Sequence, residues 1–295
     1  MRYGAVFPTT EMGKDPGAIR AWVAAVEDLG FERIVAYDHV VGAVHADREP
    51  KLWGPYTEKD EFHEPLVLFS YIAAITTDIE LVTGVLILPQ RQAVLVAKQA
   101  ADLDLLSGGR LVLGVGTGWN YVEYEALNTE FRNRAKRMEE QVELMRQLWT
   151  SPVNDFSGKY HRVDRGGIVP LPNRQIPVWF GGSAEASVRR AARMGDGYIF
   201  GNTGERIQNA LAILREELAL QGRDVASFPT DAVLHLQRGE EALSPEVAAW
   251  KASDTTWLSL STMANRMLTG DMTPVNKVDA QIAMLDNAMK WVKAL

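Results

Sequence analysis

A carboxylate and an imidazole stand next to each other at the end of an apolar run, in the sequence Tyr37-Asp38-His39. Histidine gives and takes a proton near neutral pH, and a neighbouring carboxylate can orient its ring or contact a cofactor. We therefore interpret His39 as a candidate catalytic residue, with Asp38 as its orienting group or a cofactor ligand. The alternative is that Asp38 caps a loop and His39 packs at a rim.

Two glycine-rich loops offer backbone N–H groups to an anion. Each follows an apolar run and precedes an amphipathic segment, so its N–H groups point out of a helix N-terminus, where a phosphate binds well. The residues of the two loops are Gly181, Gly182, Ser183, Gly201, Asn202 and Thr203. We predict a phosphate site here, with Ser183 as the N-cap of its helix. Two tight turns with capping residues are the alternative.

Further candidates for ligand contact lie in and around other apolar runs. Gly84 interrupts the apolar run of residues 80–87, between Thr83 and Val85. A glycine within a strand indicates a bulge or a close approach of the backbone to a ligand, although a packing glycine has the same pattern. Polar or aromatic residues at expected rim or lid positions are Trp53, Tyr56, Trp119, Asn120 and Trp179. We take Trp53, Tyr56, Trp119 and Asn120 as candidates for substrate contact.

The sequence lacks the residues or spacings that several other kinds of site require. The chain has no cysteine, which excludes disulfides, thiolate nucleophiles and thiolate metal sites. The remaining histidines, His45, His63, His161 and His235, form no metal-ligand spacing. No G-x-S-x-G nucleophile motif occurs either. We therefore predict no metal site and no hydrolase chemistry.

The elements that must position these residues follow a regular alternation. Eight short apolar runs alternate with amphipathic segments, and their near-continuous apolar character is typical of parallel strands covered on both faces. The runs are residues 3–7, 33–37, 80–87, 111–115, 177–181, 197–200, 231–236 and 256–261. Eight such units favour an α/β fold, a single closed (β/α)8 TIM barrel over residues 1–295. An open doubly wound sheet is the alternative, but residues 114–118 have the spacing G-x-G-x-G rather than G-x-G-x-x-G.

Two long segments interrupt the alternation, and we interpret both as insertions. Residues 42–64 follow the second strand and would lie at the C-terminal face, where they are the candidate lid; residues 150–175 follow the fourth strand and its helix. Among the helices, the pattern predicts one long amphipathic helix over residues 123–149. It also predicts a final helix with Thr273 as its cap and Pro274 as its first residue.

Composition limits the partners of this protein. Lys and Arg total 31 and Asp and Glu total 38, giving a net charge of −7, which argues against nucleic-acid binding. We find no export signal and no apolar stretch near the ~20 residues of a membrane helix, and so expect a cytoplasmic protein without a membrane partner.

In chain order, these segments resemble the luciferase-like monooxygenase superfamily of flavin- and deazaflavin-dependent barrels. The matching segments are residues 36–40, 81–89, 97–104, 106–111, 113–119, 177–182 and 190–197. The run L-S-G-G-R-L followed by L-G-V-G-T-G-W is the most specific part. Within the superfamily, the sequence is most similar to the actinobacterial branch of coenzyme F420-dependent oxidoreductases.

This resemblance implies hydride transfer between F420 and a small organic substrate at the C-terminal mouth of the barrel. It also implies a non-proline cis peptide at Gly84–Val85 behind the cofactor ring, with Asp38 and His39 near the reactive ring. The implied cofactor-binding residues are Asp38, Thr83, Gly84, Val85, Gly116, Thr117, Gly181, Gly182, Ser183, Gly201, Asn202 and Thr203.

Two departures narrow the activity. Trp119 stands where F420-dependent glucose-6-phosphate dehydrogenases place a glutamate, which disfavours sugar phosphates and favours an apolar or aromatic substrate. Thr117 stands where luciferase alpha chains carry a phosphate-binding arginine, which disfavours FMN. Two alternatives remain: an FMN-dependent two-component monooxygenase with a flavin or deazaflavin reductase as partner, and a flavin-binding barrel without catalysis. By analogy with the family, we expect a homodimer.

Overall fold

The predicted barrel is confirmed by a computed structural model, which describes residues 1–201, 204–253, 255–264 and 274–295. Within these residues, parallel strands run in the order β3-β2-β1-β11-β10-β9-β8-β5, and β3 also pairs with β5, which closes the sheet. The strands are β1 (Arg2–Val6), β2 (Arg33–Ala36), β3 (Glu80–Thr83), β5 (Leu111–Gly116), β8 (Val178–Gly182), β9 (Gly197–Phe200), β10 (Thr230–His235) and β11 (Trp257–Ser261). Each coincides with a predicted apolar run. A short strand, β4 (Leu86–Ile87), continues the line of β3.

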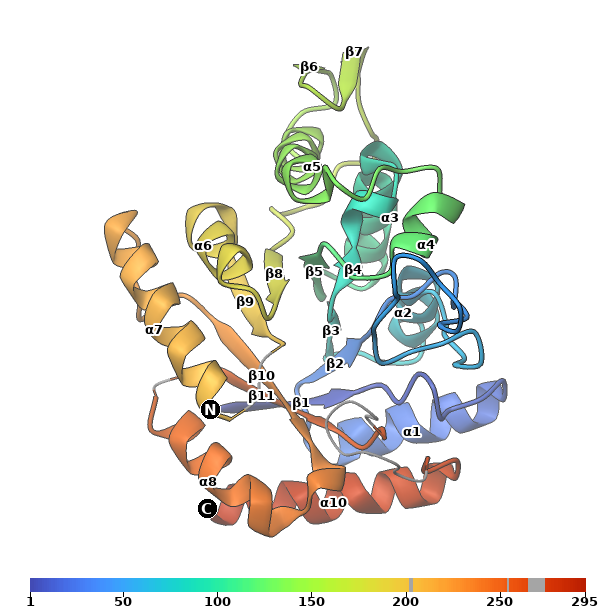
Figure 1. Cartoon of the computed structure of the whole chain (residues 1–295), viewed down its shortest axis with the longest axis vertical. Helices are drawn as coiled ribbons and strands as arrows, with labels where there is room; N and C mark the ends of the chain where they lie inside the picture. The colour runs from blue at the N-terminus through green and yellow to red at the C-terminus, as the bar shows by residue number, and fades with distance from the viewer. Residues whose placement is uncertain (202–203, 254, 265–273) are drawn as a thin grey trace.

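Helices surround the strands on the outside (Figure 1). The helices are α1 (Pro16–Asp28), α2 (Pro65–Ala73), α3 (Ala93–Leu106), α4 (Tyr121–Ala126), α5 (Arg134–Leu148), α6 (Glu185–Met194), α7 (Glu205–Leu220), α8 (Glu240–Lys251) and α10 (Val278–Ala294), with 3-10 turns η1 (Leu88–Gln90) and η2 (Leu236–Arg238). Their apolar faces pack on the outward-facing strand residues in one continuous core, which removes both surfaces from water.

Three predictions about helices are wrong. The helix expected over 123–149 is two helices, α4 and α5, because Asn128 turns the chain with a φ of 54°. The N-cap of α6 is Ala184 rather than Ser183. The last helix begins at Val278 rather than Pro274, and the predicted cap Thr273 lies outside the described residues. Tertiary hydrogen bonds to Val275 account for the late start: its N–H donates to Glu11 Oε2 (3.0 Å) and its carbonyl accepts from a glutamine side chain of α10.

Inside the barrel, alternate strand residues form layers across the axis. The bottom layer holds Arg33, whose guanidinium pairs with Asp231 at 3.0 Å and also with Glu80. Both Arg33 and Asp231 are fully buried. Trp179 packs in this layer at 4.7 Å from the guanidinium, because it is the second residue of β8. Its predicted place at the rim is therefore wrong.

The apolar middle of the interior is formed by side chains from every side of the barrel. The buried members of this cluster are Val6, Val35, Val82, Val112, Trp179, Ile199, Trp257 and Met263. Because residues i, i+2 and i+4 of a strand share a face, the last inward-facing residue of each strand faces the mouth, the C-terminal end of the barrel. The sequence of the strands thus decides which side chains meet a ligand there.

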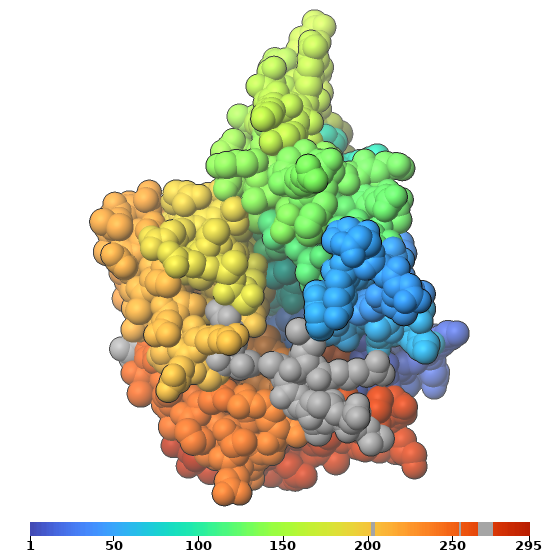
Figure 2. Space-filling view, in the orientation of Figure 1, coloured from blue at the N-terminus to red at the C-terminus, as the bar shows by residue number. Residues whose placement is uncertain are grey.

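The two predicted insertions take different positions. The first contacts the segment after β5, since Tyr121 Oη donates to the Pro50 carbonyl at 2.6 Å and Gly54 lies against the Trp119 ring. That places it at the mouth, as expected. The second follows α5 and folds into an antiparallel hairpin of β6 (Asn154–Ser157) and β7 (Arg162–Gly166), which projects from the body in Figures 1 and 2.

Candidate active site

His39 lies at the mouth against a buried carboxylate that sequence reasoning missed. Its Nδ1 is 3.3 Å from Glu123 Oε2, and the two side chains are only 9% and 1% exposed. Glu123 Oε1 accepts from the backbone N–H groups of Val40 and Val41, and Oε2 accepts from Gln90 Nε2 at 3.1 Å. The carboxylate therefore joins the loop after β2 to helix α4 and fixes one ring nitrogen of His39.

The surroundings of Glu123 keep it ionised. Burial raises the pKa of its carboxyl, but hydrogen bonds from His39, Val40 and Val41 outweigh burial, so that the pKa lies below its usual range. An ionised carboxylate can only accept hydrogen bonds, so His39 donates through Nδ1–H. In neutral His39, this leaves Nε2 as the basic atom that can exchange a proton with a ligand.

Aromatic side chains surround the His39 ring. Ring centroids of Tyr56, Phe62 and Trp119 lie 5.1, 4.9 and 5.4 Å from it. Burial raises the pKa of the Tyr56 phenol well above its usual value, with a smaller effect from Tyr37, so the phenol stays uncharged. An aromatic setting of this kind suits an apolar substrate group and limits the access of water to the histidine.

Two of the residues predicted to contact substrate make no ring contact with His39, and their contact with a substrate stays a prediction. Trp53 is 68% exposed and stacks under Lys51 Nζ at 3.9 Å. Asn120 is buried as the N-cap of α4, where its Oδ1 accepts from the Val122 N–H at 3.1 Å and its Nδ2 donates to the Val41 carbonyl at 3.2 Å. The structure thus brings Tyr56 and Trp119 to His39, but not Trp53 or Asn120.

Asp38 points away from His39. Its carboxylate accepts from the Ile87 N–H at 2.8 Å and from Arg91 at 2.7 Å, and Arg91 also pairs with Glu64 at 2.8 Å. Burial raises the pKa of the Asp38 carboxyl, and the effect of Arg91 opposes this only in part. The group that orients His39 is therefore Glu123, in place of the Asp38 that the sequence suggested. Asp38 instead ties the end of β2 to β4, through Ile87, and to Arg91 beyond it.

A row of glycines forms a flat shelf at the mouth, beside His39. Gly84, Gly116 and Gly181 occupy inward-facing positions, and the side chain of Val85 fills the space between them. A Cβ at Gly116 would overlap Val85 Cγ2, and a Cβ at Gly181 would lie 2.5 Å from Val85 Cγ1. The Gly84–Val85 peptide is cis, as the resemblance implied. The three glycines therefore leave this level of the interior to the Val85 side chain, and a flavin or deazaflavin ring that lay across Val85 would meet no side chain from these three positions.

The predicted phosphate loops lie next to each other at one end of this shelf. Gly182 has a φ of 143°, and its carbonyl accepts from the Gly201 N–H at 2.9 Å. Ser183 follows at the start of the turn into α6, while Asn202 and Thr203 lie outside the described residues. Other predicted contacts flank the shelf: Thr83 Oγ1 donates to the Gly114 carbonyl at 2.7 Å, and the Thr117 carbonyl accepts from Tyr124 Oη at 2.7 Å.

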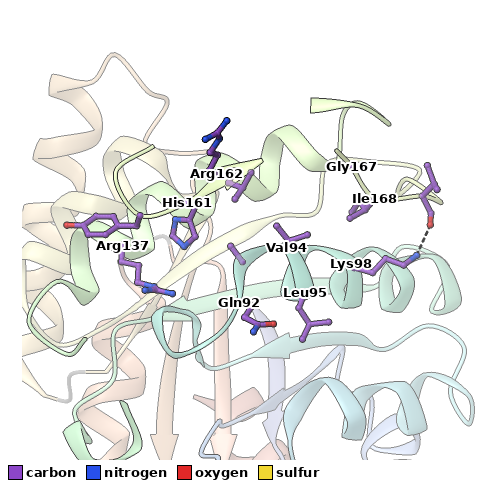
Figure 3. A pocket seen from close by; sticks show the side chains of 13 residues that line it. Gln92, Val94, Leu95, Lys98, Arg137, His161, Arg162, Gly167 and Ile168 are labelled. Carbon is purple, nitrogen blue, oxygen red and sulfur yellow. Dashed lines mark hydrogen bonds between the residues drawn. The ribbon is translucent and has the colours of Figure 1, made fainter. Parts of the chain in front are cut away.

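A separate groove of about 790 Å³ lies outside the barrel, between α3, α5 and the hairpin of the second insertion (Figure 3). Its residues include Val94, Leu95, Arg137 and His161, and none of the predicted site residues. His161 is held there by Glu140, at 2.8 Å. The groove is therefore distinct from the mouth. The expected homodimer stays a prediction, as do the other predicted partners.

Two absences concern the described residues alone. They contain no group of three or more His, Asp or Glu side chains placed to hold a metal ion. None of their helices is both long and apolar enough to cross a membrane.

Sequence signals for the missed residues existed. Glu123 stands three residues after the N-cap Asn120, in the spacing of a capping box, which places it at the start of a helix directly after β5. Strand parity also predicts the inward positions of His235 and Ser261. Nothing in the sequence indicates that Glu123, rather than Asp38, turns toward His39, because that contact joins residues 84 positions apart.

The closed barrel, with a histidine–carboxylate pair at its mouth, defines a TIM-barrel protein. The profile of the luciferase-like monooxygenase family matches residues 1–278, and the chain belongs to this family. It is accordingly an oxidoreductase.

Relatives within the family carry different activities. The chain is 30% identical over 254 residues to the pyrimidine monooxygenase RutA of Allorhizobium ampelinum, covering 76% of this chain and 69% of the relative. It is 30% identical over 223 residues to an F420-dependent glucose-6-phosphate dehydrogenase of Kineococcus radiotolerans, covering 70% and 60%. The solved structure of the monooxygenase RslO1 from Streptomyces bottropensis has the same fold, with a TM-score of 0.74, 19% identity and coverage of 97% and 98%.

Proposed function

We propose that this protein is a coenzyme F420-dependent oxidoreductase that transfers hydride to or from a small organic substrate. The observation that carries the proposal is the His39–Glu123 pair, which lies beside the glycine shelf and is enclosed by aromatic rings. A hydride acceptor or donor needs a partner that moves a proton, and this pair supplies one where a ring on the shelf would meet its substrate.

The residues of the shelf fit the cofactor. Gly84, Gly116 and Gly181 would lie under the ring, with Val85 behind it, and the loop of Gly182 and Ser183 would take the phosphate through its backbone. When bound, the deazaflavin supplies two-electron hydride chemistry. Asp38 would act on this arrangement indirectly, by holding β4 in place.

The protein's own groups supply proton transfer and exclusion of water. Glu123 holds the Nδ1–H of His39, so Nε2 can take a proton from an alcohol that is being oxidised, or return it to a carbonyl that is being reduced. Tyr56, Phe62 and Trp119 surround the ring and favour an apolar substrate body. Trp119 stands where the F420-dependent glucose-6-phosphate dehydrogenases place a glutamate, which disfavours a sugar phosphate as the substrate.

The second candidate is an FMN-dependent two-component monooxygenase served by a flavin reductase. The relationship to a pyrimidine monooxygenase supports it, and the shelf fits either ring. Thr117, in the position of the phosphate-binding arginine of luciferase alpha chains, favours the deazaflavin. A flavin-binding barrel without catalysis does not account for a histidine positioned by a buried carboxylate.

A parallel equilibrium titration of the apo-protein with F420 and FMN, oxidised and reduced, tests the proposal. We expect micromolar or tighter binding of F420 and much weaker binding of FMN. A preference for reduced FMN, together with oxygen consumption, would replace hydride transfer by oxygen activation. The His39→Ala variant separates catalysis from binding, because it should keep its affinity for the cofactor and lose turnover.

A further inference from the structure

Three buried polar atoms at the mouth have no hydrogen-bond partner among the described residues. They are His235 Nδ1, Gln237 Oε1 and Ser261 Oγ. A buried polar atom without a partner is costly, and native structures leave few of them. Three such atoms at the ends of two neighbouring strands indicate a place where a ligand completes the hydrogen bonding.

Strand register brings these groups together on the inner face. His235 is the residue opposite Ser261 in the β10–β11 pair, and Asp231, four residues before His235, points into the barrel toward Arg33. Residues of the same parity share a face, so His235 and Ser261 both point inward at the mouth. Gln237 joins them through its Nε2, which donates to the Thr262 carbonyl at 2.8 Å.

The neighbouring side chains leave this cluster unsatisfied. Ser261 Oγ approaches the Tyr37 phenol closely enough to lower its pKa, although burial raises that pKa by more, and the two do not meet in hydrogen-bonding geometry. Arg238, the nearest cation along the chain, is occupied by Glu246 at 2.9 Å. His235 Nδ1, Gln237 Oε1 and Ser261 Oγ thus stay without a hydrogen-bond partner among the described residues, at neighbouring strand ends.

The cluster is uncharged at neutral pH. Burial, together with a smaller effect from the charge of Arg238, lowers the pKa of His235 to about 4. The ring is therefore neutral, with one donor and one acceptor nitrogen, while the serine hydroxyl does both and Gln237 Oε1 accepts. These neutral donors and acceptors suit an uncharged ligand edge that carries both a hydrogen-bond acceptor and a donor. They do not suit a charged ligand, because no opposite charge would offset its burial.

We propose that His235, Gln237 and Ser261 form a subsite that binds an uncharged carbonyl and N–H edge, as in an amide or a cyclic imide. This inference deepens the proposed function and rests on it for the identity of the ligand. The edge belongs either to the substrate or to the pyrimidinedione of the cofactor ring. In both cases the subsite lies at the ends of β10 and β11, apart from His39 after β2.

Succinimide is a suitable probe, and N-methylsuccinimide, which lacks the N–H donor, is its matched control ligand. The full chain, with and without F420, is titrated at neutral pH while the ring nitrogens of ¹⁵N-labelled histidines are followed by NMR. We expect succinimide to shift the His235 signals and to bind more tightly than its N-methyl analogue. Ser261→Ala should weaken succinimide binding about tenfold, the usual loss for one hydrogen bond in a buried site.

Two further variants complete the experiment. Ser244→Ala, on the exposed face of α8, is the matched control and should bind like the wild type. His235→Phe removes the reporting ring, so its succinimide binding is measured by calorimetry and should be at least tenfold weaker. Ser261→Ala, which removes a single oxygen, keeps the test valid if His235→Phe does not fold. Failure of succinimide to shift His235, or equal affinity of the wild type and Ser261→Ala for both succinimide and F420, overturns the subsite.

The source of the edge follows from the same titrations. If the cofactor supplies it, Ser261→Ala weakens F420 binding and succinimide competes with F420. If the substrate supplies it, F420 affinity is unchanged and succinimide binds the loaded protein as well as the apo-protein. A wild-type chain that binds neither F420 nor FMN would refute the proposed function, whereas the succinimide titration of the apo-protein would still decide the subsite.

Discussion

Replacing Glu123 by glutamine should reverse the tautomer of His39. The carboxylate accepts from two backbone N–H groups on Oε1 and from His39 Nδ1 and Gln90 Nε2 on Oε2. A glutamine keeps one acceptor oxygen for the two backbone groups, and its NH2 then faces His39. Gln90 can turn its amide to accept, since its Oε1 lacks a partner among the described residues. His39 must then accept at Nδ1 and carry its proton on Nε2.

The cost of this change follows from the hydrogen bonds involved. A hydrogen bond to a charged group contributes ~1.5–3 kcal/mol and a neutral one ~0.5–1.5 kcal/mol, so each of the four bonds loses about 1 kcal/mol. Relief from burying a charge offsets part of this loss. We therefore expect the free energy of unfolding to fall by about 2 kcal/mol, with the fold retained. Glu123→Ala would instead leave all four donors without an acceptor.

The tautomer is measured by long-range ¹H–¹⁵N NMR of the His39 ring, and the stability by urea unfolding. The wild type should show a protonated Nδ1, and Glu123→Gln a protonated Nε2, with affinity for the cofactor unchanged within about twofold. Turnover should fall about 100-fold or more, because a proton on Nε2 prevents this nitrogen from acting as the general base. The same His39 tautomer in both proteins would refute the role that we give to Glu123.

Three other perturbations give independent outcomes. Arg33→Met should lower the free energy of unfolding by ~3–5 kcal/mol in urea, because it leaves the fully buried Asp231 carboxylate without its cation, and adding Asp231→Leu should recover much of the loss. Burial lowers the pKa of His235 from 6.5 to about 4, so the folded state binds fewer protons than the unfolded state between pH 6.5 and pH 4. The free energy of unfolding should therefore fall by about 3 kcal/mol from pH 7 to pH 4. His235→Phe should remove this part of the pH dependence. An equal pH dependence in both proteins would contradict the shift. Gly182→Val should weaken F420 binding at least tenfold, whereas Gly222→Ala, also at positive φ but with nothing near it, should not; unchanged affinity in Gly182→Val would place the phosphate elsewhere.

The barrel was predictable because each of its strands carries its own signal. An apolar run such as residues 111–115 is buried on both faces, and its consecutive apolar side chains indicate this burial in the sequence. Helix boundaries were less predictable, since they depend on tertiary contacts. The final helix starts late because Glu11, far away in sequence, holds Val275 in an irregular segment. No local pattern around Val275 indicates this.

The sequence predicted which residues lie at the mouth of the barrel, but not which of their side chains contact one another. The position of His39 after β2 follows from strand order, and the cis peptide at Gly84–Val85 follows from family resemblance. The choice between Asp38 and Glu123 as the partner of His39 depends on side-chain direction in an irregular loop, which strand parity does not reach. His235 was dismissed because it forms no metal spacing, although its parity within β10 places it at the mouth.

The central claim is that the cofactor ring lies on the glycine shelf, and intermolecular NOEs test it most directly. The chain is prepared with labelled valine and leucine methyl groups and titrated with F420. We predict NOEs between the deazaflavin ring protons and the methyl groups of Val85, which pack against Gly116 and Gly181. NOEs to Val94 and Leu95 in the outer groove, with none to Val85, would contradict the account.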